Sequence, residues 1–75
     1  MSRDTWELVR MREMVHGGQV RQVRVSAGLS LAEVGREVGV TPSTVFYWER
    51  GRIPRGDAAV RYARLILELV ALSER

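Results

Sequence analysis

The sequence predicts an all-α fold, five short helices in a single domain on residues 1–75, and three features of the chain indicate it. Glycine and proline divide the chain into five segments, each with the length of one helix. Within the segments, apolar residues recur at intervals of three and four, which places them on one helical face. Four segments also open with a residue type that caps helix N-termini. Because 75 residues bury only a thin core, a second copy of the chain is the first partner to expect.

The first two segments are predicted to be helices on residues 4–15 and 19–27. Asp4, followed three residues later by Glu7, has the pattern of a capping box, and a Gly-Gly pair ends the first helix. The buried stripe of this helix is expected to comprise Leu8, Met11, Met14 and Val15. The β-branched valines of the second segment also suit a strand. Its apolar positions nevertheless share one helical face and favour a helix: Val20, Val23 and Ala27.

Residues 31–51 predict two helices joined by a tight turn. Ser30 and Glu33 form a capping-box pattern at the start of the first helix. Thr41 is expected to be the N-cap of the second helix, and Pro42 suits its first turn because the missing N–H would be unpaired there. The inner side of this unit is expected to hold Leu31, Val34, Val38, Val40, Val45 and Trp48.

Two glycines of this unit indicate how closely its helices approach each other. Gly35 stands in a helix interior, where glycine costs about 1 kcal/mol relative to alanine, so its presence requires a packing reason. Gly39 follows the first helix where the chain reverses direction, and we expect it to have a positive φ. Together the two glycines predict a closely packed helix-turn-helix.

The last segment is predicted to be one long helix on residues 57–73, with Asp57 as its N-cap. Its apolar positions exceed what one buried face needs. The first face comprises Val60, Ala63, Ile66, Leu67 and Val70, and a second row comprises Leu65, Leu69 and Leu72. The second row predicts one of two arrangements. Either it forms a homodimer interface, together with Trp6 and Leu8 of the first helix, or the first helix folds back over the last.

The composition excludes several function classes. The chain has no cysteine and a single histidine, so we expect no disulfide, no metal site and no cofactor. No nucleophile stands beside a base and no glycine-rich phosphate loop occurs, so we expect neither an enzyme nor a small-molecule substrate. The first 25 residues have no signal-peptide core, and no apolar run has the length of a membrane span. These features predict a cytoplasmic protein with no membrane partner.

The positive charge is concentrated in the middle of the chain. Net charge is +3, and residues 16–64 contain eight arginines against four acidic residues, an excess of four. Every basic residue is arginine, whose planar fork suits bidentate binding of phosphate and guanine. The arginine bias also has a second interpretation, a GC-rich coding sequence, which concerns no function.

Residues 28–54, GLSLAEVGREVGVTPSTVFYWERGRIP, resemble the helix-turn-helix of the lambda-repressor and Cro type, also called the XRE family. The resemblance implies a lambda-repressor-like DNA-binding domain with a core on residues 19–56, preceded by an extra helix. In this family the second helix of the unit, here residues 41–50, lies in the major groove. Leu31 and Pro42 replace polar residues common in relatives, so the resemblance does not transfer a target sequence.

The resemblance also implies roles for individual residues. Ser43 and Tyr47 match family positions that read bases, and the neighbouring residues expected to contact bases with them are Pro42, Thr44 and Phe46. Two adjacent aromatic rings facing water need a cover, and thymine methyl groups can provide it; the alternative is that Phe46 packs against another helix or a partner subunit. Positions expected to contact phosphate are Arg21, Ser30, Arg50, Arg52 and Arg55. Arg24 and Glu49 match positions that form a structural ion pair between helices.

The resulting functional prediction is a transcriptional repressor that occupies a DNA operator. A Cro-like protein of a phage or prophage is expected, acting as a homodimer on a palindromic double-stranded operator. It is expected to associate with the nucleoid of a bacterial or phage-infected host cell. Two alternatives use the same module: a recombination directionality factor or an antitoxin, which binds DNA with a protein partner. In a third, the helix-turn-helix serves protein contact alone.

Overall fold

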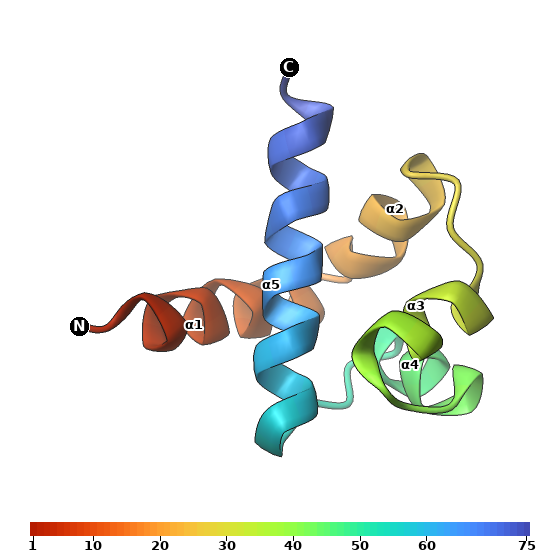
Figure 1. Cartoon of the computed structure of the whole chain (residues 1–75), viewed down its shortest axis with the longest axis horizontal. Coiled ribbons are helices and arrows are strands. Elements are labelled where there is room, and N and C mark those ends of the chain that lie inside the picture. Colours follow the sequence, from red (N-terminus) through yellow and green to blue (C-terminus); the bar gives the residue numbers. More distant parts are fainter.

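The computed structural model describes residues 1–75 and contains all five predicted helices and no strand (Figure 1). Their bounds are α1 Arg3–His16, α2 Gln19–Ser26, α3 Leu31–Val38, α4 Pro42–Glu49 and α5 Gly56–Ser73. The second segment, whose valines also suit a strand, is therefore helical. None of the five helices combines the length and the apolar character needed to cross a lipid bilayer.

The N-caps of α3 and α4 are those that the sequence predicts. Ser30 and Glu33 form the complete capping box at α3, and the Thr41 side chain accepts a hydrogen bond from the Thr44 amide at α4. Such caps each stabilise a helix by about 1 kcal/mol because they pair amides that the helix leaves free. The starts of both helices of the unit are thus fixed by local sequence.

Two predicted N-caps are wrong. Ser2, not Asp4, caps α1, and its hydroxyl accepts a hydrogen bond from the Thr5 amide. The Asp4 carboxylate instead accepts a hydrogen bond from Arg64 on α5 at 2.9 Å. At α5 the N-cap is Arg55, and Asp57 lies within the first turn of the helix. There the carboxylate still stabilises the helix through its dipole.

Helix α5 is the central element of the fold. It runs the full height of the view in Figure 1, with α1 crossing it and with α3 and α4 beside its lower half. Contacts with α1, α2 and α3 surround it. The excess of apolar positions on α5 is therefore used largely within one chain, because α1 folds over α5. The hydrophobic core comprises twelve buried residues: Met11, Met14, Val15, Val20, Val34, Val38, Val45, Trp48, Ala59, Tyr62, Ala63 and Ile66.

Tyr62 is a large core residue that the helical pattern did not identify. Its ring lies 4.5 Å, centroid to centroid, from the ring of Trp48 on α4, so this pair joins α5 to the second helix of the unit. Burial raises the pKa of the Tyr62 hydroxyl, and the nearby Glu49 carboxylate raises it further. The hydroxyl therefore stays protonated at all physiological pH values.

A polar cluster fastens α1 to α5. Glu7 is buried at this contact, and its Oε1 lies 3.8 Å from Nε of Arg64, the same arginine that binds Asp4. The hydrogen bond to Asp4 raises the pKa of Arg64. The sequence pattern predicts Glu7 only as part of a capping box. Its burial is not predictable from neighbouring residues, because it depends on Arg64, far along the chain.

Candidate nucleic-acid interface

The turn between α3 and α4 depends on two glycines, as the sequence predicts. The Gly35 carbonyl accepts hydrogen bonds from the amides of Gly39 at 2.7 Å and Val40 at 2.9 Å. Gly39 has a φ of 86°, a conformation that only glycine adopts without strain. A Cβ atom on Gly35 would lie 2.6 Å from the Val40 carbonyl oxygen, which is too close for any side chain. Gly35 therefore permits the close approach of the two helices.

Arg61 on α5 braces the same turn from the outside. Its Nε donates a hydrogen bond of 2.7 Å to the carbonyl oxygen of Val38, at the end of α3. Its guanidinium also lies against Gly39, where a Cβ atom would stand 3.4 Å from Nη2. From the sequence alone, Arg61 is only one of the arginines that contribute to the positive charge of residues 16–64. Nothing local indicates its role, because its partner is 23 residues away.

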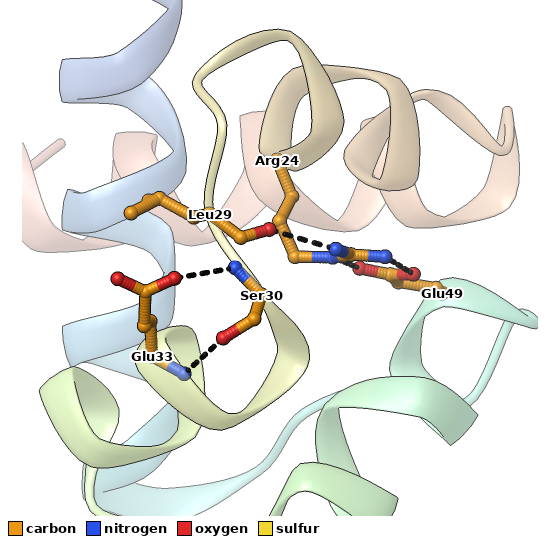
Figure 2. A network of polar contacts seen from close by, with 5 residues as sticks. All are labelled: Arg24, Leu29, Ser30, Glu33 and Glu49. Carbon is orange, nitrogen blue, oxygen red and sulfur yellow. Dashed lines mark hydrogen bonds and ion pairs between the residues drawn. The ribbon is translucent and has the colours of Figure 1, made fainter.

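A second brace joins the end of α2 to the end of α4 (Figure 2). Nε and Nη2 of Arg24 donate hydrogen bonds to the two carboxylate oxygens of Glu49, and Nη1 donates to the Leu29 carbonyl at 2.8 Å. The Arg24 side chain is 11% exposed and that of Glu49 is 5% exposed. The hydrogen bond to Glu49 raises the pKa of Arg24. The structure thus forms the ion pair that the family resemblance implied.

The N-terminus of α3 lies beside this brace and is held by the capping box, also drawn in Figure 2. The Ser30 amide donates to Oε1 of Glu33 at 2.9 Å, and the Glu33 amide donates to the Ser30 hydroxyl at 3.0 Å. The bond from the Ser30 amide to the carboxylate, with a smaller contribution from the Ser30 side chain, lowers the pKa of Glu33 below its ordinary value. Ser30 is exposed, but its hydroxyl already accepts a hydrogen bond from the helix that it caps.

Helix α4 turns one face inward and the opposite face to solvent. Val45 and Trp48 are buried, as predicted. The residues of the opposite face are exposed: Pro42, Ser43, Phe46, Tyr47 and Arg50. Thr44 differs from the expected base contacts, because it is half-buried and its hydroxyl lies 3.0 Å from that of Thr41. The solvent face of α4 therefore has two small side chains near its start, Pro42 and Ser43, and two aromatic rings further along.

The two aromatic rings form one unit. Phe46 is 37% exposed and Tyr47 is 52% exposed. Their centroids lie 5.5 Å apart in an edge-to-face arrangement, a favourable geometry for aromatic pairs. The guanidinium of Arg50 lies over the Phe46 ring at 4.5 Å, and that of Arg52 lies over the Tyr47 ring at 5.9 Å. We call these four residues the aromatic-arginine cluster.

Hollows with arginines in their walls lie on both sides of α4. The first, of about 400 Å³, has Arg21, Arg24, Leu31, Phe46, Glu49 and Arg50 as its lining. The second, of about 590 Å³, is lined by Val40, Thr44, Trp48, Arg52, Ile53, Arg55 and Ala58. The exposed face of α4 thus stands as a ridge between two arginine-lined hollows.

Ion pairs within the chain divide the arginines into two groups. Arg24 is neutralised by Glu49, and Arg64 by Asp4 and Glu7, so neither contributes free positive charge to the surface. Four exposed arginines around α4 form no ion pair: Arg21, Arg50, Arg52 and Arg55. The only acidic residue of α4, Glu49, faces Arg24. The ridge is therefore bordered by uncompensated positive charge.

Comparison with known proteins agrees with this arrangement. A family described as helix-turn-helix matches residues 20–66, which cover α2 to most of α5 and leave out α1. No curated protein and no solved structure matches the chain. More than half of the chain lies within the matched range. The chain belongs to the XRE family of helix-turn-helix proteins, and it is a DNA-binding regulator.

Proposed function

We propose that this chain is a sequence-specific repressor of the Cro type that occupies a double-stranded operator by inserting α4 into the major groove. The observation that supports it is the ridge formed by the exposed face of α4, with unpaired arginines on both sides. A major groove is about 12 Å wide and admits one helix between two rows of phosphates. A helix with neutral side chains on its crest and arginines on its flanks matches that charge pattern.

The proposed base contacts lie along the crest. Ser43 and Tyr47 are the main ones, because both are exposed and one helical turn apart. Pro42 is exposed at the first turn and provides an apolar surface, and Phe46 borders Tyr47. Thr44 has a lesser role, since its hydroxyl already contacts Thr41.

The proposed phosphate contacts border the crest. Arg21 and Arg50 share one hollow, and Arg52 and Arg55 share the other, so each pair suits one strand. Ser30 contributes through the start of α3, where free amides and the helix dipole attract a phosphate. Each arginine that binds a phosphate releases about one counterion, which makes binding steeply dependent on salt.

We further propose that the repressor is a homodimer, with a palindromic operator. An apolar groove of about 460 Å³ lies between the end of α2 and the last turns of α5. Its lining comprises Gln22, Val23, Ser26, Ala27, Leu69, Leu72 and Ser73, none of them charged. A second copy suits this groove, because a two-fold contact brings identical surfaces together and an uncharged surface does not repel itself. The two copies of α4 would then stand about 34 Å apart, one turn of DNA.

The fold separates Leu65 from the other two leucines of the second apolar row of α5. Leu65 is half-buried against the core and borders a hollow beside α3, so the proposed interface retains Leu69 and Leu72. Leu8 is likewise half-buried in the chain's own core, whereas Trp6 is exposed under Arg10. The proposed dimer therefore uses α5 with α2 and does not need α1.

A salt-dependent binding experiment tests the proposal. Fluorescence anisotropy with labelled random duplex DNA should give a log–log slope of affinity against salt of about −0.9 for each phosphate contact. Replacing Arg21, Arg50, Arg52 or Arg55 with alanine should reduce the slope by about one each. Arg36→Ala, at an exposed arginine of α3, serves as the control. Absence of salt-dependent binding to the DNA would favour a module that contacts protein alone.

Binding to natural sites then separates the remaining functions. A repressor of this type should bind most tightly to the promoter region upstream of its own gene. Tighter binding to a recombination site, or only in the presence of a second protein, would instead identify a recombination directionality factor or an antitoxin. In each case the place of action is bacterial DNA, in a host cell or a phage-infected one.

A further inference from the structure

The crest of α4 has an unusual chemistry for a surface that reads bases. Amide and carboxylate side chains, which distinguish adenine and cytosine by hydrogen bonds, are absent from its exposed face. Glu49 is the only such residue of α4, and it is bound to Arg24. The residues that remain on the crest are one proline, one serine and two aromatic rings. Apart from the hydroxyls of Ser43 and Tyr47, the crest therefore offers only apolar contact to bases.

The aromatic-arginine cluster fixes where that contact occurs. Arg50 covers one face of Phe46, and Arg52 lies over Tyr47, while each ring packs against the other. Both rings still keep more than a third of their surface exposed. Neither arginine forms an ion pair, so nothing within the chain draws the guanidinium groups away from the rings. The rings therefore present a fixed apolar surface between two positive charges.

That surface matches one feature of a DNA major groove. The 5-methyl group of a pyrimidine is the apolar group exposed on the floor of the groove, and phosphates line both walls. A protein partner with an apolar patch would cover the rings but would not neutralise the two arginines. DNA satisfies both requirements at once.

We propose that Phe46 and Tyr47 read the 5-methyl group of a pyrimidine, in thymine or in 5-methylcytosine, at one or two positions in each half of the bound site. This inference rests on the proposed function, since it requires α4 to lie in the major groove. The arginines hold the rings and take the flanking phosphates. The methyl group is the feature of the base that the two rings contact.

The experiment starts from duplexes selected by the purified chain from a random library. Each thymine of a selected duplex is replaced in turn by deoxyuridine, which removes only the methyl group. Affinity should fall about fourfold for each methyl group that the rings contact. In a Phe46→Ala, Tyr47→Ala double variant, the thymine and deoxyuridine duplexes should bind equally. Trp6→Ala, at an exposed aromatic residue of α1, should keep the fourfold difference.

A second set of duplexes identifies the source of the methyl group. At a sensitive position the thymine pair is replaced by a 5-methylcytosine pair or by a cytosine pair. Retained affinity with methylcytosine alone shows that any 5-methylpyrimidine is read, and loss with both shows that thymine is the ligand. Equal affinity for cytosine and thymine would overturn the inference.

Failure of the proposed function and failure of the methyl reading give different results. If no duplex is enriched and binding does not depend on salt, the proposed function itself is wrong. If duplexes are enriched but every deoxyuridine substitution changes affinity less than twofold, only the reading of methyl groups is wrong. A fourfold effect that persists in the double variant would also overturn it, because other residues would then contact the methyl group. Circular dichroism of each variant confirms that the helices are intact.

Discussion

Arg24 at the end of α2 and Glu49 at the last residue of α4 are joined by two hydrogen bonds that are nearly shielded from solvent (Figure 2). The same guanidinium binds the Leu29 carbonyl in the loop that leads to α3. One side chain therefore connects three elements of the DNA-binding unit. Because α4 is only eight residues long, such a connection fixes its direction more firmly than its own hydrogen bonds do.

Breaking this ion pair should destabilise the fold strongly. Glu49→Ala leaves the Arg24 guanidinium buried without its partner, so the free energy of unfolding should fall by about 3 kcal/mol in urea denaturation. The double variant Arg24→Met, Glu49→Leu removes both charges and should recover most of this loss. A loss below about 1 kcal/mol for Glu49→Ala, the range of exposed pairs, would contradict the burial of the pair.

Gly35→Ala should also destabilise the fold, although alanine favours helices. The added Cβ atom would stand 2.6 Å from the Val40 carbonyl oxygen, so the turn between α3 and α4 must shift. We expect the free energy of unfolding, measured by urea denaturation, to fall, because a steric cost of about 1–3 kcal/mol outweighs the roughly 1 kcal/mol that alanine gains in an open helix. Gly17→Ala is the control, because its Cβ meets mainly the flexible end of Gln19. Stabilisation by Gly35→Ala would mean that the helices pack less closely than described.

The capping box should make stability depend on pH in the acid range. Hydrogen bonds from Ser30 lower the pKa of Glu33 below its ordinary value of 4.5, so the native state favours the carboxylate. This contribution is complete above pH 4.5 and is lost as the pH falls through the lowered pKa. The difference in stability between the wild type and Glu33→Gln should therefore be largest near neutral pH and shrink towards pH 3.

Thermal unfolding at several pH values measures this difference. Glu13→Gln, which removes an exposed carboxylate outside any cap or ion pair, controls for the change in net charge. A difference that grows as the pH falls would contradict the role of Glu33 in the cap.

Features set by neighbouring residues were predictable from the sequence, and those set by distant residues were not. The five helices, the capping box at Ser30 and the turn at Gly39 depend on residues a few positions apart. The cap of α1 was misassigned because Ser2 and Asp4 both suit an N-cap, and the choice follows from Arg64 binding Asp4. The brace by Arg61 is likewise not predictable from local sequence, because its partner Val38 is 23 residues away.

The candidate site shows the same division. The helical period placed Val45 and Trp48 inward, so the outward residues of α4 followed directly. The stacking of Arg50 on Phe46 and of Arg52 on Tyr47 did not follow, because it depends on side-chain rotamers and on the path of the loop after α4. Likewise, the sequence could not show which arginines are neutralised by ion pairs.

The proposed dimer should respond to charge in the groove between α2 and α5. Leu72 is exposed at the end of this groove, so Leu72→Lys should leave the monomer folded. In the dimer it would place two like charges in an apolar contact, and the dissociation constant should rise at least tenfold, as measured by sedimentation equilibrium. Trp6→Lys is the matched control on α1. A dimer dissociated by Trp6→Lys and not by Leu72→Lys would place the interface on α1.

Tyr47→Ala should weaken DNA binding without weakening the fold. Tyr47 and Trp6 are equally exposed, at 52% each, and both lie beside an arginine, but only Tyr47 stands on the crest of α4. Loss of one base-reading side chain costs about 1–3 kcal/mol, so affinity for a selected duplex should fall about tenfold or more. Trp6→Ala should bind as tightly as the wild type. Because both truncations expose similar surface in the free protein, their midpoints of urea unfolding should shift by similar small amounts, which separates loss of contact from loss of structure. Equal affinity of the two variants for DNA would mean that α4 does not enter the groove with this face.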